Sequence, residues 1–141
     1  FELMDAGFDE IGPLADAFNR PQARLSDGQA LAPFVTAMMD VSDGLLLDSE
    51  RMAAASQVGI QIDLACVPLS PLYISCRTDS LESQLQAASW GDDYQLLFTA
   101  PPHISLPVPA TAIGCVFSGG GLTLKDGATP VKLPPMLGYQ H

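Results

Sequence analysis

The strongest constraint on the fold is a mostly apolar run that stops at a group of polar residues. Residues 34–41 are typical of a buried strand, and Ser42-Asp43-Gly44 follow directly. Beyond this turn, apolar side chains at helical spacing predict a helix that includes Leu45, Leu46, Met52, Ala53 and Ala55. Ser42 or Asp43 can cap this helix, and Gly59 can close it in a left-handed conformation. The central unit of the predicted fold is therefore a strand that leads through a polar turn into a helix.

The rest of the chain mixes helices with short strands. Spacing predicts a helix between Asp9 and Arg20, a polar connector over 21–33, and a helix near 81–88 capped by Thr78 or Asp79. Strands are predicted over 60–64, 94–99, 110–117, 122–125 and 129–133. Gly119-Gly120-Gly121 and Asp126-Gly127 are typical of hairpin turns. This pattern predicts an α+β domain rather than a doubly wound one.

Composition excludes several classes of protein. The 141 residues fit one compact domain. With 48% hydrophobic and only 16% charged residues, the chain is too hydrophobic to be a disordered segment. The formal net charge of -10, with scattered basic residues, argues against partners with an anionic surface, so no nucleic acid and no membrane is expected.

The three cysteines lack a Cys-x-x-Cys spacing, which favours neither a disulfide framework nor a zinc site and indicates a reducing, cytoplasmic location. No apolar run reaches the roughly 20 residues of a membrane span.

The polar turn is also the best candidate for chemistry. Asp40 and Asp43 lie three residues apart around Ser42. Carboxylates are ligands that Mg²⁺ takes together with phosphates and water, and backbone N–H groups at a helix start attract phosphate oxygens. The plainer alternative is that Asp43 is an ordinary helix cap and Asp40 a solvated strand end. No G-x-x-x-x-G-K-[ST] loop is present, so any kinase chemistry must depend on metal rather than on a phosphate-loop lysine.

Several segments, in order, resemble the thiamine-monophosphate kinases of the aminoimidazole ribonucleotide synthetase-like superfamily. Asp40-Val41-Ser42-Asp43-Gly44-Leu45 is similar to the family's Asp-Ile-Ser-Asp-Gly-Leu motif. Pro68-Leu69-Ser70, residues 91–98 (Gly-Asp-Asp-Tyr-Gln-Leu-Leu-Phe) and Gly138-Tyr139-Gln140-His141 follow in the family's order. The resemblance implies a C-terminal domain with a mixed β-sheet and packed helices, over residues 1–141, with the N-terminal ATP-binding domain absent.

The resemblance also implies a function and its residues. A full-length enzyme of this family transfers the γ-phosphate of ATP to thiamine monophosphate with Mg²⁺, and is commonly a homodimer. By resemblance Asp40 and Asp43 are magnesium ligands, Asp43 with a catalytic role, Ser42 contacts ATP, and Asp92 and Tyr139 contact the substrate. The isolated domain is expected to be inactive.

One motif departs from the family pattern, and other functions stay open. The family usually has Gly-Gly-Glu-Asp-Tyr-Glu, whereas residues 90–95 are Trp-Gly-Asp-Asp-Tyr-Gln, so the substrate contact at Asp92 is shortened by one methylene. Gly91-Asp92-Asp93 can also be a plain turn, and Tyr139 an exposed tail residue. The alternatives are a selenophosphate synthetase or hydrogenase-maturation type of enzyme from the same superfamily, or a non-catalytic acidic binding or regulatory domain.

Overall fold

The computed structural model describes residues 20, 22–76 and 80–139. The helix predicted between Asp9 and Arg20 therefore lies outside the described residues, apart from its last position. The described chain forms, in order, α2 (Leu25–Leu31), β1 (Ala37–Asp40), α3 (Leu45–Ser56), β2 (Gly59–Asp63), a short 3-10 helix (Leu64–Cys66), α4 (Pro71–Cys76), α5 (Leu81–Ser89), β3 (Leu96–Thr99), β4 (Gly114–Phe117), β5 (Gly121–Asp126) and β6 (Thr129–Val131).

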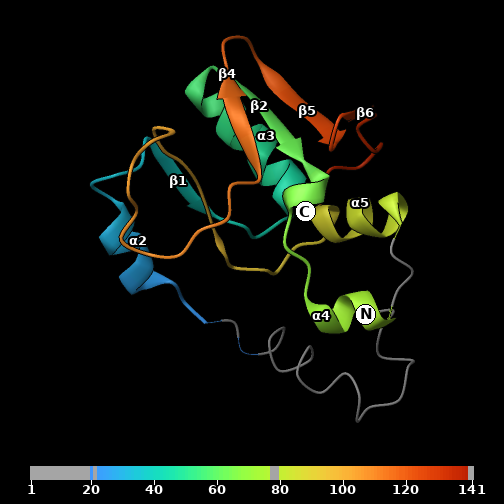
Figure 1. Ribbon diagram of the computed structural model, residues 1–141, viewed down its shortest axis with the longest axis horizontal. Helices are drawn as coiled ribbons and strands as arrows, with labels where there is room; N and C mark the ends of the chain where they lie inside the picture. Colours follow the sequence, from blue (N-terminus) through green and yellow to red (C-terminus); the bar gives the residue numbers. More distant parts are fainter. Residues whose placement is uncertain (1–19, 21, 77–79, 140–141) are drawn as a thin grey trace.

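These strands form two separate sheets (Figure 1). β1 and β3 pair antiparallel, with Met39 opposite Leu97. The second sheet has the order β4-β2-β5-β6 and is mixed, because β2 runs parallel to β5 and antiparallel to β4. The predicted α+β class with a mixed sheet and packed helices is thus confirmed.

The core lies between α3 and the four-stranded sheet. Ile60 and Ile62 of β2 pair with Leu122 and Leu124 of β5, and all four side chains are buried because alternate residues of a strand face the same side. The helix contributes Leu46, Met52 and Ala53 to the same cluster. Val41, which directly follows β1, and Leu97 of β3 also join it. The helix that follows the polar turn is therefore fixed by its apolar face, which holds the turn in place.

The four-stranded sheet corrects one prediction about the glycine-rich segment. Gly119-Gly120-Gly121 does not form a hairpin loop, since β2 lies between β4 and β5 and the segment crosses the end of β2. Gly59, the first residue of β2, pairs with Phe117 on one side and Gly121 on the other. A Cβ at Gly59 would lie 2.3 Å from the Phe117 ring, so a larger residue there would require this partly exposed ring to move. The left-handed residue that ends α3 is Gln57 instead, at φ 55°.

Three short helical segments fall where the sequence predicted loops. α2 lies in the expected polar connector, and the 3-10 helix and α4 occupy the segment around Pro68 and Pro71. The predicted helix at 81–88 is present as α5, and its cap is Ser80, whose hydroxyl accepts a hydrogen bond from Ser83 N at 3.2 Å. The three segments that the sequence missed, α2, the 3-10 helix and α4, are only three to seven residues long, too short for periodicity to identify them.

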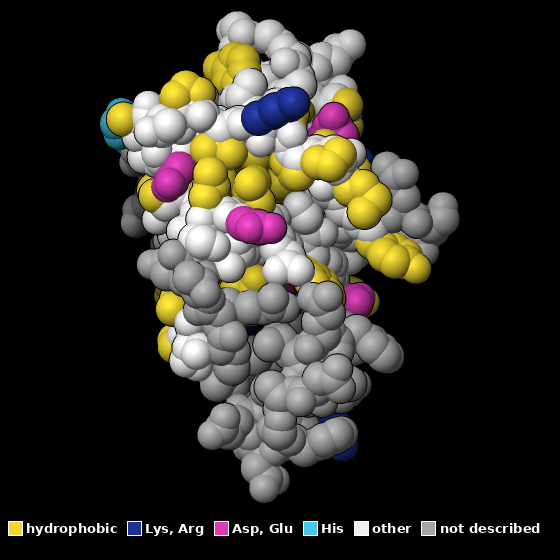
Figure 2. All heavy atoms as spheres, turned by 90° about the vertical axis from the view of Figure 1, so that its right-hand side faces the viewer, with side chains coloured by type: hydrophobic (Ala, Val, Ile, Leu, Met, Phe, Trp, Pro, Cys, Tyr) yellow, Lys and Arg dark blue, Asp and Glu magenta, His cyan; other side chains and the backbone are white. Residues whose placement is uncertain are grey.

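Part of the surface is apolar. Exposed large hydrophobic side chains among the described residues include Leu25, Val116, Met136 and Tyr139. On the face that Figure 2 shows, hydrophobic side chains gather in one region, while acidic and basic side chains lie apart from one another. The described part of this face thus carries no continuous basic stripe of the kind that binds nucleic acid.

A second polar cluster, away from the polar turn, ties β2 to the β5–β6 hairpin. One carboxylate oxygen of Asp63 accepts hydrogen bonds from Gly127 N at 2.9 Å and Ala65 N at 3.2 Å, and the other lies 2.7 Å from Lys125 Nζ. The Lys125 hydrogen bond, followed by that from Gly127, holds the pKa of Asp63 below its ordinary value of 3.8. Asp63 thus joins three segments through one ionised side chain.

We predict that Asp63→Asn lowers the melting temperature at neutral pH. Because the pKa of Asp63 is lowered by folding, its stabilising effect is fully present above the unfolded value of 3.8 and is lost as the pH falls through the folded value. The difference in melting temperature between parent and variant should therefore shrink on acidification, as thermal unfolding between pH 7 and pH 2 can show. Asp126→Asn, one residue from Lys125 but outside the pair, is the control. A difference that stayed constant over this range would contradict the prediction.

Candidate functional site

The polar turn between β1 and α3 is shaped by glycine and not by a capping side chain. Gly44 occupies the N-cap position at φ 121°, and no side-chain hydrogen bond caps the helix. The expectation that Ser42 or Asp43 caps α3 is therefore wrong. A Cβ at Gly44 would lie 2.8 Å from the carbonyl oxygen of Ser89, so this glycine is needed both for its backbone angle and for the close approach of α5.

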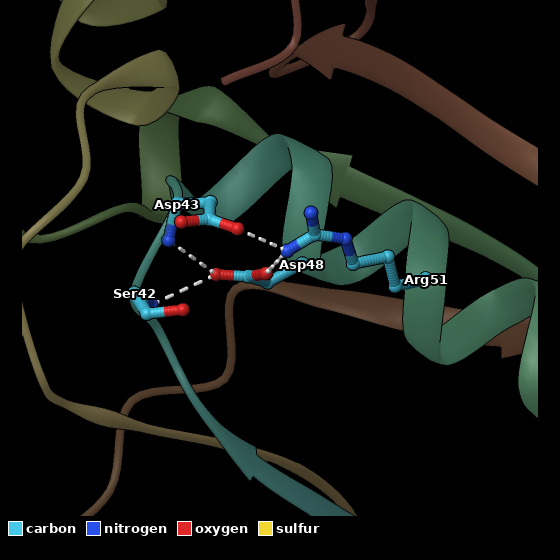
Figure 3. A network of polar contacts seen from close by, with 4 residues as sticks. All are labelled: Ser42, Asp43, Asp48 and Arg51. Atoms are coloured by element: carbon cyan, nitrogen blue, oxygen red, sulfur yellow. Dashed lines mark hydrogen bonds and ion pairs between the residues drawn. The ribbon is translucent and has the colours of Figure 1, made fainter. Parts of the chain in front are cut away.

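A buried carboxylate from inside the helix holds the turn. The side chain of Asp48 is fully buried, and its Oδ2 accepts hydrogen bonds from the backbone N of Ser42 at 2.9 Å and of Asp43 at 3.1 Å (Figure 3). These two N–H groups lie just before Gly44, the N-cap of α3, so they are not the first N–H groups of the helix itself. The carboxylate of Asp48 thus fixes the conformation of the turn.

Arg51 connects Asp48 to Asp43. Its Nη1 lies 2.9 Å from Asp48 Oδ1 and 2.5 Å from Asp43 Oδ2, so one nitrogen bridges two carboxylates (Figure 3). The hydrogen bond to Asp43, followed by that to Asp48, raises the pKa of Arg51. The Arg51 side chain is 48% exposed and that of Asp43 14%. The predicted metal ligand Asp43 is thus held by a chain of contacts that begins at a buried group.

Two distant segments reach the turn through backbone hydrogen bonds. Asp92 N donates to the carbonyl oxygen of Ser42 at 2.9 Å, Tyr94 N donates to that of Val41 at 2.8 Å, and Tyr139 N donates to that of Asp43 at 2.8 Å. The structure therefore brings the three motif segments, 40–46, 91–94 and 138–139, to one place.

These contacts require glycine beside the turn. A Cβ at Gly91 would lie 2.4 Å from the carbonyl oxygen of Ser42, and one at Gly138 would lie 2.3 Å from that of Asp43. In the first segment Asp92 and Tyr94 both have positive φ, 68° and 50°. Non-glycine residues in this region are uncommon and cluster at functional sites. The 91–94 segment thus leads toward β3 through two residues in the left-handed backbone region.

The predicted acidic side chains surround Tyr94. Its hydroxyl donates to Asp92 Oδ1 at 3.0 Å, and this bond is the main cause that raises the pKa of Tyr94. The charges of Asp40 and Asp43 raise it further by smaller amounts. Asp40 and Tyr94 also line a hollow of about 510 Å³ beside α2. Asp40, Asp43 and Asp92 thus share one electrostatic environment.

Tyr139 has an anchored backbone and an exposed side chain. Its N–H is bonded to the turn, while its ring is 64% exposed. The backbone hydrogen bond argues against a frayed tail, whereas the exposed side chain agrees with the alternative of an exposed tail residue. The neighbouring Gln140 and His141, which belong to the same motif, lie outside the described residues.

The donor chemistry at the turn fits Mg²⁺, although the described residues do not complete a metal site. Asp40 and Asp43 offer the hard oxygen ligands that magnesium prefers. Within residues 20, 22–76 and 80–139, no three His, Cys, Asp or Glu side chains group closely enough to hold a metal ion. Magnesium commonly uses one or two carboxylates together with substrate phosphates, so the remaining ligands would have to come from elsewhere.

The sequence analysis missed three residues of this site. Asp48 and Arg51 lie within the helical pattern at a spacing of three, which is the spacing of a helical ion pair, and this was the available signal. Tyr94 lies within the quoted 91–98 motif, but nothing in the sequence indicated that its hydroxyl reaches back to Asp92. The contacts of Asp48 and Arg51 with Ser42 and Asp43 depend on the geometry of the turn, which apolar spacing does not specify.

Comparison with known proteins places this geometry in a family. The family model of the AIR synthase related protein, C-terminal domain, matches residues 3–124. The chain belongs to this family. Its α+β fold with a mixed sheet is that of the AIR synthase related C-terminal domain.

The relatives of this AIR synthase related domain include annotated kinases. The chain is 33% identical to the thiamine-monophosphate kinase of Caulobacter vibrioides, over 99% of this chain and 42% of the relative. It is 35% identical to that of Escherichia coli K12, over 86% of this chain and 40% of the relative. The chain is thus homologous to the C-terminal region of thiamine-monophosphate kinases and spans about two fifths of their length.

Solved structures give the same relationship. The structure of AaThiL complexed with AMPPCP and TMP matches with a TM-score of 0.76 and 32% identity, over 89% of this chain and 42% of that one. The crystal structure of thiamine monophosphate kinase from Aquifex aeolicus matches with a TM-score of 0.74 and 30% identity, over 93% of this chain and 45% of that one. Among the helices described for this domain, none is both long and apolar enough to cross a membrane.

We predict that Asp48→Asn destabilises the domain although it preserves the shape of the side chain. The amide has one oxygen for the contacts that two carboxylate oxygens now make, and its NH₂ group would face another donor. The free energy of unfolding in urea should fall by about 1–3 kcal/mol, the cost of leaving buried polar groups unpaired. Glu50→Gln, an exposed acid on the same helix, should change it by less than about 0.5 kcal/mol. Equal stability of the two variants would show that Asp48 does not hold the turn.

Proposed function

We propose that this chain is the C-terminal domain of a thiamine-monophosphate kinase, which transfers the γ-phosphate of ATP to thiamine monophosphate. In this reaction a phosphate oxygen of thiamine monophosphate bonds to the γ-phosphorus, the bond to ADP breaks, and thiamine diphosphate forms. The observation that carries the proposal is the convergence of segments 40–46, 91–94 and 138–139 on one turn. The likeness to AaThiL, solved with AMPPCP and TMP, supports it.

Each proposed residue has a place at this turn. Asp40 and Asp43 are the proposed magnesium ligands, and Ser42 the proposed ATP contact. Bound magnesium would neutralise negative charge on the phosphates of ATP. Asp43 would contribute to catalysis by fixing that charge close to the transferred group, in an orientation set by its contact with Arg51.

Asp92 and Tyr139 are the proposed contacts to thiamine monophosphate. Tyr94 orients the Asp92 carboxylate through its hydroxyl. The exposed ring of Tyr139 can stack on the pyrimidine or lie against the cationic thiazolium ring, since aromatic faces attract cations. Their backbones are bonded to the same turn, so the substrate contacts and the phosphate site would move as one unit.

The proposed partner is an N-terminal domain that supplies the rest of the nucleotide site. The relatives are more than twice as long as the matched region. Two carboxylates and a hydroxyl cannot position both phosphate groups for in-line attack, and phosphoryl transfer depends on such positioning. We therefore propose that the two domains close on the substrates, and that the complete protein is a homodimer.

The test of this function is an assay for thiamine diphosphate. The full-length protein that contains this domain is expected to form thiamine diphosphate from ATP, thiamine monophosphate and Mg²⁺. Residues 1–141 alone are expected to form none, because the nucleotide site is incomplete. Selenide and hydrogenase-maturation substrates serve as controls for the related enzyme classes. If the full-length protein consumed ATP only with one of these, or not at all, the proposed function would be wrong.

A separate prediction concerns the shortened side chain at Asp92. Asp92→Glu restores the length usual in the family and should change the Michaelis constant for thiamine monophosphate more than that for ATP, because the carboxylate is proposed to contact the substrate alone. Steady-state kinetics with each substrate varied in turn will measure both constants. Asp93→Glu, the neighbouring acid, is the matched control. A change confined to the Michaelis constant for ATP would contradict the assignment of Asp92 to thiamine monophosphate.

A further inference from the structure

Arg51 places a positive charge at the otherwise acidic turn. Its Nη1 bridges Asp43 and Asp48, and one guanidinium against two carboxylates still leaves one negative charge. In the part of the chain that the structure describes, Arg24 and Lys125 pair with other acids, Asp27 and Asp63. Arg51 thus pairs with the proposed magnesium ligand Asp43.

The guanidinium group keeps binding capacity beyond these two ion pairs. Both contacts use Nη1, and the hydrogen bonds of the described residues leave Nη2 and Nε without a partner. Figure 3 shows the second Nη nitrogen directed away from the two carboxylates. The side chain is 48% exposed, so a ligand can reach it from solvent. A guanidinium can hold a carboxylate with one edge and bind an oxyanion with another, since its five donors lie in a fixed plane.

We propose that Arg51 binds a phosphate oxygen of the reacting substrates while it holds Asp43 in place. This inference rests on the proposed function and adds to it a phosphate contact that comes from α3. The backbone N–H groups of Ser42 and Asp43 are occupied by Asp48, so they do not fill this role. An exposed arginine next to the proposed metal ligands can supply a side-chain donor, and arginine–phosphate hydrogen bonds are among the stronger ones in proteins.

The fixed position of Arg51 favours this role over that of a simple counter-ion. A long side chain loses rotamer freedom when it binds a ligand, which weakens binding. Two carboxylates already restrain the guanidinium, one of them on the fully buried Asp48. The side chain therefore loses much of its rotamer freedom when the domain folds, before a ligand binds. The phosphate could belong to ATP or to thiamine monophosphate, and binding experiments with each can distinguish the two.

The test measures binding to the full-length protein by calorimetry, with AMPPCP and with thiamine monophosphate separately, and without magnesium. The variants are Arg51→Met, Asp43→Asn and the double variant. Arg51→Met should weaken the binding of at least one ligand by about 10- to 100-fold, because one hydrogen bond to a charged group is lost. The double variant should bind that ligand more weakly than Asp43→Asn by a similar factor. Lys125→Met, which also removes a cation paired with a carboxylate, should change neither affinity.

The outcomes separate the possible roles. If the double variant bound both ligands as tightly as Asp43→Asn, Arg51 would only balance the charge of Asp43 and the proposal would be wrong. Unchanged affinities in Arg51→Met would also overturn it. Formation of thiamine diphosphate by the parent protein is assayed in parallel. If the parent formed none, the proposed function would fail, whereas the AMPPCP measurement would still decide whether Arg51 contacts a phosphate.

Discussion

The buried carboxylate of Asp48 is the interaction on which the site depends. One oxygen accepts hydrogen bonds from the backbone N–H groups of Ser42 and Asp43. The other accepts a hydrogen bond from Arg51, which also contacts Asp43. The first N–H groups of a helix lack partners within the helix, and those just before it need partners as well. Here Asp48, a residue inside α3, accepts the hydrogen bonds of the two N–H groups before the helix, so the turn is tied to the helix core. The packing of Leu46 and Met52 against the sheet then fixes the turn relative to the whole domain.

Once the turn is fixed, its carbonyl groups place the other two segments. Three backbone carbonyl oxygens accept one hydrogen bond each: that of Val41 from Tyr94 N, that of Ser42 from Asp92 N, and that of Asp43 from Tyr139 N. These contacts are between backbones, so they do not depend on side-chain identity except at Gly91 and Gly138, where a Cβ would collide. The replacement of a glutamate by Asp92 therefore changes the reach of a carboxylate without moving the segment that carries it.

The sequence predicted the parts of the fold that local patterns determine. The strand, polar turn and helix around Asp43 follow from apolar spacing, as do β2 and α5. The order of the strands does not, because the insertion of β2 between β4 and β5 pairs residues more than 50 positions apart. The shared position of Asp40, Ser42 and Asp43 is local and was predictable. The contacts made by Asp48, Arg51 and Tyr94 depend on a backbone turn that no residue pattern specifies.

The balance of charge separates the two polar clusters of the domain. Asp63 meets one cation, Lys125, and two backbone N–H groups, so its charge is matched within the fold. At the turn, Asp43 and Asp48 share one arginine, and Asp40 and Asp92 add further negative charge around Tyr94. Two like charges about 5 Å apart repel by about 3 kcal/mol at an effective dielectric of 20. A fold can tolerate such an excess because Asp48 and the backbone contacts hold the turn, and a bound divalent cation would relieve it. The turn thus gathers more acidic side chains than the Asp63 cluster, which agrees with the metal site proposed there.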